Sequence, residues 1–397
     1  PYTGTANAKI QLGVVSLADG KVNWLPHGDN DDIYLPRVEW TKNARYLSYQ
    51  WQSRDQHKLE LRLVDLSSNK QKVLLTETSD TWLNLHDDLH FLKDDKGFIW
   101  ASERDGYKHL YYYDFNGKLK RQLTRGDWVV DELDAVNEKL GSVYFTARKD
   151  TPLERHLYQV SLDGGDIKRL TEPNYDHALV MAKDGSSFID SFSNVTTPNK
   201  VALRALDGTV LTWLEQNELD KTHPLTAYHA QLTAPRFGTI KAEDGQTMHY
   251  RMFEPAAFEP GKKYPVIVSV YGGPHAQRVT NSWSARDLYL HYLVQQGYLV
   301  FQLDNRGSYN RGKAFEDPIY KKLGVAEIAD QIKGVEYLRS LPYVDAGKIA
   351  IYGHSYGGYM AIMAMFKASD YFAAGVSGAP VTDWALYDTH YTERYLG

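Results

Sequence analysis

The stretch Ile349-Ala350-Ile351-Tyr352-Gly353-His354-Ser355-Tyr356-Gly357-Gly358 decides the fold of the second half of the chain. It carries the pattern G-x-S-x-G after the β-branched run Lys348–Tyr352 and before a helix-forming run that begins at Gly357. This pattern is typical of a sharp strand-to-helix turn that exposes a serine hydroxyl above the edge of a sheet. Glycines are needed there because neighbouring backbones pass closely. The stretch therefore predicts that Ser355 is a nucleophile.

Strands and helices alternate around this turn. Such alternation predicts a mostly parallel, doubly wound sheet with helices on both faces. The expected strands are Tyr264–Tyr271, Tyr298–Leu303, Lys348–Tyr352 and Phe372–Ser377, and the expected helices are Ala285–Gln296, Val325–Leu341 and Gly357–Ala368.

The first half of the chain repeats itself instead. Leu-Thr recurs at Leu75, Leu123 and Leu170, with spacings of 48 and 47 residues. An Asp between two strand-like runs keeps a similar period, at Asp19, Asp65, Asp114, Asp163 and Asp207. Four short strands per repeat of this length are typical of a β-propeller blade. One period is expected to hold strands Tyr46–Trp51, Leu59–Asp65 and Gln71–Thr76, and the next Gly97–Ser102, His109–Asp114 and Lys118–Thr124.

The period stops between Leu219 and Arg236, where Pro224 and Pro235 interrupt the chain. We therefore predict a partial β-propeller of four blades plus the end of a fifth over residues 1–222, and a second domain over residues 234–397. Both ends are expected to be cut from a longer protein.

Composition excludes several classes of protein. The 45 basic and 50 acidic residues give a net charge of −5, so no basic field for nucleic acid is expected. The absence of cysteine excludes disulfides, cysteine-ligated metals and thiol nucleophiles. The longest apolar runs are far too short for a membrane helix. His86 and His90 have the spacing of a zinc helix, but Asp replaces the usual Glu and the repeat places them at the start of a blade. We expect no metal and no cofactor.

A serine nucleophile needs hydrogen-bond donors for the oxyanion that forms on attack. The backbone N–H of Tyr356 is one candidate, because it follows the nucleophile. The Tyr271 hydroxyl is the second candidate, since Tyr271-Gly272-Gly273-Pro274 follows a predicted strand.

The catalytic acid and base are harder to place. The chain order in such a fold is Ser, acid, His. His390 is the only histidine after Ser355, with Asp370, Asp383 and Asp388 as possible acids. The tail has room for about one more strand, so His390 is expected to be a loop residue. The catalytic Asp and His are expected beyond Gly397.

On these motifs the chain resembles the prolyl oligopeptidase family of serine peptidases, and most closely its dipeptidyl peptidase IV branch. The resemblance is weak through the repeats and close from about Pro235 onward. It implies that the second domain is an α/β-hydrolase domain. The stretches that carry it are Tyr271–Pro274, Asp304-Asn305-Arg306-Gly307-Ser308, Gly353–Tyr359, Asp383-Trp384 and Tyr391-Thr392-Glu393-Arg394-Tyr395.

The resemblance implies an exopeptidase that releases N-terminal dipeptides with Pro or Ala at the second position. Ser355 would be the nucleophile, with Tyr271 and Tyr356 as the oxyanion donors. Rigid aromatic walls suit a flat apolar ring, because they bury area at little conformational cost. By motif match, the proline pocket would be lined by Tyr356, Val381, Trp384, Tyr387 and Tyr391.

The sequence departs from the family in two places. The family binds the substrate's amino group with a pair of glutamates, and no convincing copy is present. Asp127–Glu132 is superficially similar but follows the Leu123-Thr124 strand, as an ordinary blade junction would. The family's animal members usually carry Trp where this chain has His354.

Several properties stay open at this stage. An acylaminoacyl peptidase or oligopeptidase of the same family, or an inactive binding scaffold, are the alternative functions. Peptides are the expected partners, with a homodimer as a further implication of the resemblance. The resemblance also implies a periplasmic or secreted location, while the sequence leaves a cytoplasmic one open.

Overall fold

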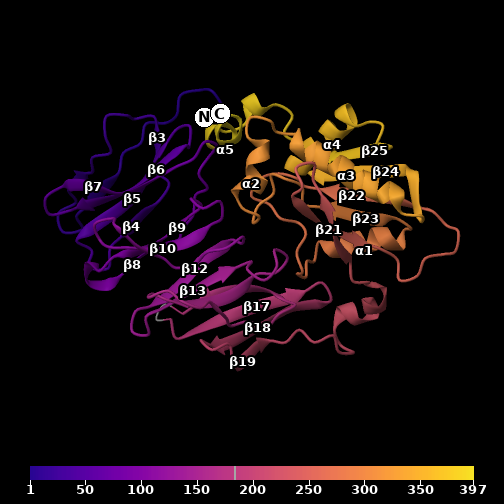
Figure 1. The fold of residues 1–397 in the computed structure, drawn as a ribbon, viewed down its shortest axis with the longest axis horizontal. Coiled ribbons are helices and arrows are strands. Elements are labelled where there is room, and N and C mark those ends of the chain that lie inside the picture. Colours follow the sequence, from indigo (N-terminus) through magenta and orange to yellow (C-terminus); the bar gives the residue numbers. More distant parts are fainter. Residues whose placement is uncertain (183–184) are drawn as a thin grey trace.

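The computed structural model describes residues 1–182 and 185–397, which form two parts lying side by side. Antiparallel sheets follow one another through the indigo to magenta part, and a mixed sheet with helices forms the orange and yellow part (Figure 1). The two termini lie together, and Tyr2 forms an isolated β-bridge with Asp388. The predicted fold class, propeller-like blades followed by a helix-covered sheet, is confirmed.

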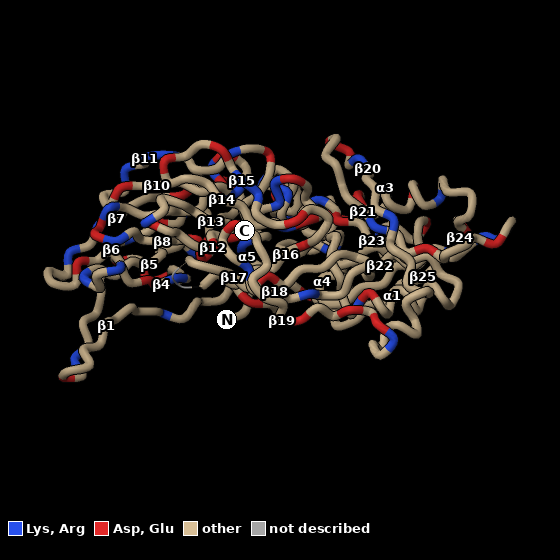
Figure 2. The backbone as a smooth tube through the Cα atoms, turned by 90° about the horizontal axis from the view of Figure 1, so that it is seen from below, with Lys and Arg blue, Asp and Glu red and all other residues tan. Residues whose placement is uncertain are grey.

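The first part contains four antiparallel sheets of the expected blade type, preceded by a two-stranded hairpin that extends away from the body (Figure 2). The short strands β3 and β4 both pair with β5, and in the other three sheets the four strands follow chain order. The strands are β1 (Gly13–Val15) and β2 (Val22–Trp24) in the hairpin; β3 (Ile33–Tyr34), β4 (Val38–Trp40), β5 (Tyr46–Ser53), β6 (Lys58–Asp65) and β7 (Lys70–Thr78); β8 (Leu89–Phe91), β9 (Phe98–Ser102), β10 (His109–Tyr113) and β11 (Leu119–Gln122); β12 (Val130–Asn137), β13 (Ser142–Ala147), β14 (His156–Ser161) and β15 (Lys168–Arg169); β16 (Asp176–Met181), β17 (Ser187–Asn194), β18 (Thr197–Ala205) and β19 (Val210–Glu215).

The repeated Asp residues have a common local role. In four of the five repeats the Asp carboxylate accepts a hydrogen bond from the backbone N–H two residues further on. This Asx turn lets the side chain replace a backbone acceptor where the chain reverses. The period seen in the sequence is therefore the period of the turn that leads into the last strand of each sheet. The four donor–acceptor pairs are Lys21–Asp19, Ser67–Asp65, Asn116–Asp114 and Thr209–Asp207.

The second part is built on one six-stranded sheet with the order β20-β21-β23-β22-β24-β25. Its last four members pair in parallel, as predicted, while β20 and β21 add an antiparallel edge that the sequence analysis did not predict. The strands are β20 (Arg236–Lys241), β21 (Thr247–Phe253), β22 (Tyr264–Val270), β23 (Leu299–Leu303), β24 (Val344–His354) and β25 (Ala374–Gly378).

Helices cover both faces of this sheet. Successive strand residues point to opposite faces: Met252 and Phe301 join the core shared with α3 and α4, whereas Phe253 and Val300 pack against α1. The short helix α2 and the C-terminal helix α5 lie outside the sheet, toward the first part (Figure 1). The helices are α1 (Asp287–Gln295), α2 (Lys313–Glu316), α3 (Ala326–Ser340), α4 (Tyr356–Lys367) and α5 (Thr389–Leu396).

Basic and acidic residues are interspersed along the backbone rather than gathered in one field (Figure 2). Among the described residues, no helix is both long and apolar enough to cross a bilayer.

One buried carboxyl should make stability depend on pH. The Oδ2 atom of Asp134 in β12 is buried and has no hydrogen-bond partner among the described residues. Burial, helped by the charge of Glu132, raises the pKa of Asp134 from 3.8 to about 8. The folded chain therefore holds this proton more tightly than the unfolded chain, so the free energy of unfolding falls as pH rises from about 4 to about 8.

We expect Asp134→Asn to remove this decline, because an amide has no proton to lose in that range. Urea unfolding at pH 5 and pH 8 measures it, with the exposed Asp163→Asn as the control. An equal difference between the two pH values in wild type and D134N would contradict the assignment.

Candidate active site

Ser355 lies at the junction of β24 and α4 in a backbone conformation that side-chain-bearing residues rarely adopt. Its φ of 60° and ψ of −120° are those of a strained turn. The Ser355 N–H donates to the carbonyl oxygen of Gly378 in β25 at 2.9 Å, which ties the turn to the adjacent strand. The predicted strand–serine–helix context is thus present, with the serine as the residue immediately before α4.

Three glycines make this turn possible. A Cβ at Gly353 would lie 2.2 Å from the carbonyl oxygen of Gly357. A Cβ at Gly357 would lie 2.3 Å from the carbonyl oxygen of Val270, and one at Gly358 would lie 2.5 Å from that of Gly378. All three contacts are with backbone, so no side-chain movement relieves them.

Tyr356, the first residue of α4, is buried, and its side chain is held by Glu327 of α3. Its hydroxyl donates to Glu327 Oε1 of α3 at 2.6 Å, and the Glu327 carboxylate also accepts from the Gly324 N–H at 3.0 Å. Burial raises the pKa of Glu327, and these hydrogen bonds oppose the rise. The Tyr356 N–H belongs to the first helical turn, where backbone donors have no partner inside the helix and carry its positive end. It can therefore donate to an anion next to Ser355.

Tyr271 follows β22 and is brought beside Tyr356. The two ring centroids lie 6.1 Å apart, and a Cβ at Gly273 would lie 2.6 Å from Cγ of Tyr356. Burial raises the pKa of the Tyr271 hydroxyl, so it stays protonated as a donor. The Arg278 guanidinium lies over the Tyr271 ring, with its carbon 5.0 Å from the centroid. Sequence reasoning missed this arginine, which no motif singles out.

Four of the five residues assigned to the pocket form one aromatic cluster. The Trp384 ring lies 5.9 Å from Tyr356 and stacks nearly parallel to Tyr391, with an interplanar angle of 14°. Tyr387 contacts both Trp384 and Tyr391, at 6.1 and 5.3 Å between centroids, and is 41% exposed. Val381 lies in the segment between β25 and Trp384 and is half-buried.

The first residues of the chain close one side of this cluster. The Thr3 N–H donates to the carbonyl oxygen of Tyr387 at 3.0 Å, and the Thr3 hydroxyl donates to that of Trp384 at 3.0 Å. The Gly4 N–H donates to Glu393 of α5 at 2.9 Å, and Arg54 forms an ion pair with the same carboxylate. The edge of the cluster is thus built jointly by the two parts of the molecule.

His390 was expected in a loop, and that expectation is wrong, because it lies within α5. The Asp388 carboxylate caps this helix by accepting from the Tyr391 N–H at 2.8 Å, so a helix that the sequence did not predict begins here. The His390 ring packs edge-on against Tyr34 at 4.6 Å. Burial and the nearby Arg394 lower the pKa of His390 to about 4. Its surroundings are those of an interface histidine rather than a catalytic base.

The Asp304–Ser308 motif supports the site through hydrogen bonds that the side chains of Asp304 and Asn305 form. The Asp304 carboxylate accepts from the backbone N–H groups of Arg278 and Val279 at 2.9 Å each. The Asn305 amide donates to the carbonyl oxygen of Gly272 at 3.0 Å. Both side chains therefore hold the loop that carries Tyr271.

Two groups of residues contain side chains of the kinds that bind metals, the pair His86 and His90 and the group around His177. His86 lies outside the strands and His90 lies in β8, so the pair is not on a helix. Among the described residues, Glu172, His177 and Asp190 form a group with ligand atoms within 4.8 Å. Arg204 already forms ion pairs with both carboxylates, at 2.8 Å each, and supplies the positive charge there.

A serine in a strained strand–helix turn, on a mostly parallel sheet that follows propeller-like blades, is the architecture of an α/β-hydrolase domain joined to a β-propeller. A family model described as the dipeptidyl peptidase IV N-terminal region matches residues 1–199, and that of the prolyl oligopeptidase family matches residues 283–397. The chain belongs to the prolyl oligopeptidase family, with the N-terminal region of the dipeptidyl peptidase IV type.

Individual relatives agree with this assignment. Human dipeptidyl peptidase 8 is 32% identical over 100% of this chain and 52% of its own length. The crystal structure of a putative dipeptidyl aminopeptidase IV from Bacteroides ovatus matches with a TM-score of 0.90 and 34% identity, over 100% of this chain and 59% of the other. That of Porphyromonas gingivalis dipeptidyl peptidase 4 matches with a TM-score of 0.91 and 30% identity, over 100% and 56%. The chain spans about half the length of the curated relatives it matches.

The glycine contacts of the turn can be tested by stability. We expect Gly353→Ala to lower the free energy of unfolding by about 1–3 kcal/mol, because its methyl group meets the backbone of α4. Gly347→Ala in the same strand is the matched control, since a Cβ there lies 3.6 Å from its nearest neighbour. Denaturant unfolding of both variants gives the comparison, and equal losses would contradict the close packing described for the turn.

Proposed function

We propose that this chain is part of a serine exopeptidase that releases N-terminal dipeptides whose second residue is proline or alanine. The observation that carries the proposal is that Ser355, in its strained turn, is followed directly by Tyr356, which contacts both Tyr271 and the aromatic cluster around Trp384. Nucleophile, oxyanion donors and apolar pocket would thus meet within one short stretch. The printed names of the relatives, dipeptidyl peptidases 8 and 4, agree with this activity.

The proposed reaction proceeds through an acyl-enzyme. The Ser355 hydroxyl attacks the carbonyl carbon of the second substrate residue, and a general base takes its proton. The carbonyl oxygen becomes an oxyanion that accepts hydrogen bonds from the Tyr356 N–H and the Tyr271 hydroxyl. The C–N bond then breaks and the departing amine takes up the proton. Water finally hydrolyses the dipeptidyl ester and frees Ser355.

The pocket would select the second residue by its shape. A proline ring is flat, apolar and short. Aromatic side chains that pack against one another can bury the faces of this ring, and they lose little rotamer freedom when they do so. Tyr356, Trp384, Tyr387 and Tyr391 would provide these walls, and Val381 would close the pocket at its aliphatic side. Alanine would fit the same space with less buried area.

The propeller part would span residues 1–222 and the hydrolase domain residues 234–397, because the repeat period stops between them. Two further properties are proposed on the family resemblance alone. The protein would act as a homodimer in the periplasm or outside the cell. An acylaminoacyl peptidase or an oligopeptidase would differ by accepting N-acetylated or longer substrates, so acetyl-Gly-Pro-p-nitroanilide separates these alternatives.

We expect Ser355→Ala to abolish hydrolysis of Gly-Pro-p-nitroanilide by the protein that contains this chain, because no other group would form the ester. Ser340→Ala, at the exposed end of α3, is the control and should keep full activity. Turnover by S355A would overturn the assignment of the nucleophile.

The Tyr271 hydroxyl would bond the substrate oxygen most strongly when the oxygen is charged. We therefore expect Tyr271→Phe to lower kcat by about a hundredfold or more with a smaller change in KM. Tyr292→Phe on the exposed face of α1 is the control. Steady-state kinetics with the same substrate decides, and an unchanged kcat would move the donor role to another group.

A further inference from the structure

The loop that carries Tyr271 has no regular structure of its own. Residues 271–283 run from the end of β22 toward α1 without a helix or a strand. Their shape therefore depends on contacts with neighbouring elements. The loop is held by its own sheet at Gly272, through Asn305, and at Arg278 and Val279, through Asp304.

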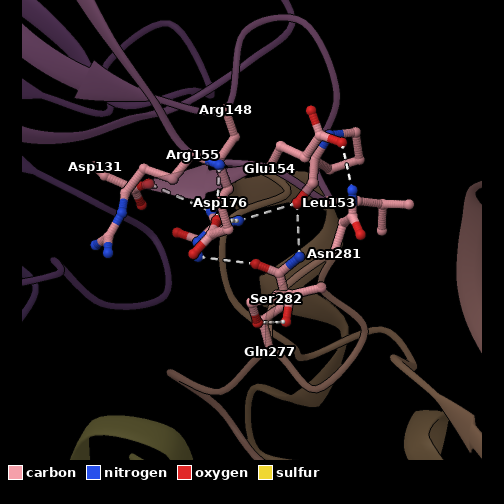
Figure 3. A network of polar contacts seen from close by, with 12 residues as sticks. Asp131, Arg148, Leu153, Glu154, Arg155, Asp176, Gln277, Asn281 and Ser282 are labelled. Carbon is pink, nitrogen blue, oxygen red and sulfur yellow. Dashed lines mark hydrogen bonds and ion pairs between the residues drawn. The ribbon is translucent and has the colours of Figure 1, made fainter. Parts of the chain in front are cut away.

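The propeller blades hold this loop as well, and Asn281 is the centre of that contact (Figure 3). Its backbone N–H donates to the carbonyl oxygen of Leu153 at 2.9 Å, and its amide donates to Glu154 Oε1 at 2.8 Å. Its amide oxygen accepts from the Val195 N–H at 3.3 Å. Asn281 therefore bonds to two different blades through three polar groups, namely its backbone N–H, its amide nitrogen and its amide oxygen.

Neighbouring residues of the loop form further hydrogen bonds with the blades. The Gln277 amide donates to the carbonyl oxygen of Pro152 at 2.7 Å, and the Trp283 N–H donates to the Ser193 hydroxyl at 3.0 Å. Arg148 lies between Asp131 and Asp176, at 3.3 and 3.6 Å, and joins the two blades behind the contact (Figure 3).

Glu154 is itself fixed at both carboxylate oxygens. While Oε1 accepts from Asn281, Oε2 lies 3.1 Å from Nε2 of His156, a fully buried ring, and accepts from the Asn174 N–H at 3.2 Å. Burial works to raise the pKa of Glu154, but the bonds from His156 and Asn281 lower it below its ordinary value. The carboxylate is therefore a rigid acceptor built into the blade, not a mobile surface group.

We infer that Asn281 and Glu154 are positioning residues through which the propeller holds the Tyr271 hydroxyl in place for oxyanion stabilisation. This inference rests on the proposed function. Arg278 lies between Gln277 and Asn281, which both bond to the propeller, and its guanidinium covers the Tyr271 ring. A shift of these two bonded residues therefore moves the surface against which that ring packs. An oxyanion donor must lie about 2.7–3.1 Å from its acceptor, and a misplacement of about 1 Å can reduce the rate about a hundredfold.

The contact can be broken and rebuilt by exchanging donor and acceptor. N281D sets two carboxylates against each other. In E154Q the single amide oxygen can accept from Asn281 or from His156 and Asn174, but it cannot serve both sides. E154Q/N281D restores one donor facing one acceptor, with the amide oxygen of the new glutamine still able to accept from His156 and Asn174. We expect each single variant to lower kcat for Gly-Pro-p-nitroanilide about 10- to 100-fold with a smaller change in KM, and the double variant to recover most of it.

A second comparison separates positioning of Tyr271 from a general structural role. In the Y271F background the positioned hydroxyl is gone, so N281D should lower kcat less than about threefold further. A purely structural role would give the same fold-loss in both backgrounds.

Three outcomes overturn the inference: single variants with wild-type kcat, no recovery in the double variant, or equal losses with and without Y271F. D163N, which removes the negative charge from another exposed ion pair between blades, is the control and should keep wild-type kinetics. If the wild-type protein fails to cleave the substrate at all, the proposed function fails instead, and the two failures are distinct.

Discussion

The close approach of the β24–α4 turn to its neighbours is the constraint on which the rest of the site depends. Ser355 can hold its strained backbone only because three glycines surround it, at Gly353, Gly357 and Gly358. Carbonyl oxygens of α4, the end of β22 and β25 occupy the positions where a Cβ of these residues would lie. That packing leaves Ser355 directly before the first N–H groups of α4. It also brings the end of β22, and with it Tyr271, against Tyr356. One steric requirement therefore places the proposed nucleophile and brings both candidate donors together.

The two parts of the molecule share the rest of the site. Thr3 and Gly4 bond to the segment that carries Trp384 and Tyr387, and Arg54 reaches Glu393 in α5. These joints are polar contacts, and their geometry is more specific than that of an apolar contact of equal area. The blades thus act as a frame that fixes loops which the hydrolase sheet alone leaves without regular structure.

Much of this architecture follows from sequence because its causes are local. The Asx turns at Asp65, Asp114 and Asp207 recur with the blade period, and the glycines around Ser355 stand next to the residue they serve. The expected strands in the blades match the observed ones to within one or two residues at each end. The pairing of β20 and β21 with the parallel sheet was not foreseen, because nothing local sets the partner of an edge strand.

Long-range contacts account for the other differences. Asn281 and Glu154 are 127 residues apart, and no motif marks either of them. Arg278 over Tyr271 and Glu327 under Tyr356 likewise depend on how separate elements pack. The loop expected at His390 rested on a tail with room for about one more strand, whereas the Asp388 cap begins a helix there. Sequence therefore identified the groups proposed for the chemistry but not the groups that support them.

The central claim is that the strained turn makes Ser355 a nucleophile. Reaction of the protein that contains this chain with a fluorophosphonate probe, followed by peptide mass spectrometry, tests it most directly. We expect a single adduct on Ser355, which requires both a reactive hydroxyl and donors for the phosphonyl oxygen. A folded protein that stays unlabelled at Ser355, or that carries the adduct on another serine, would contradict it.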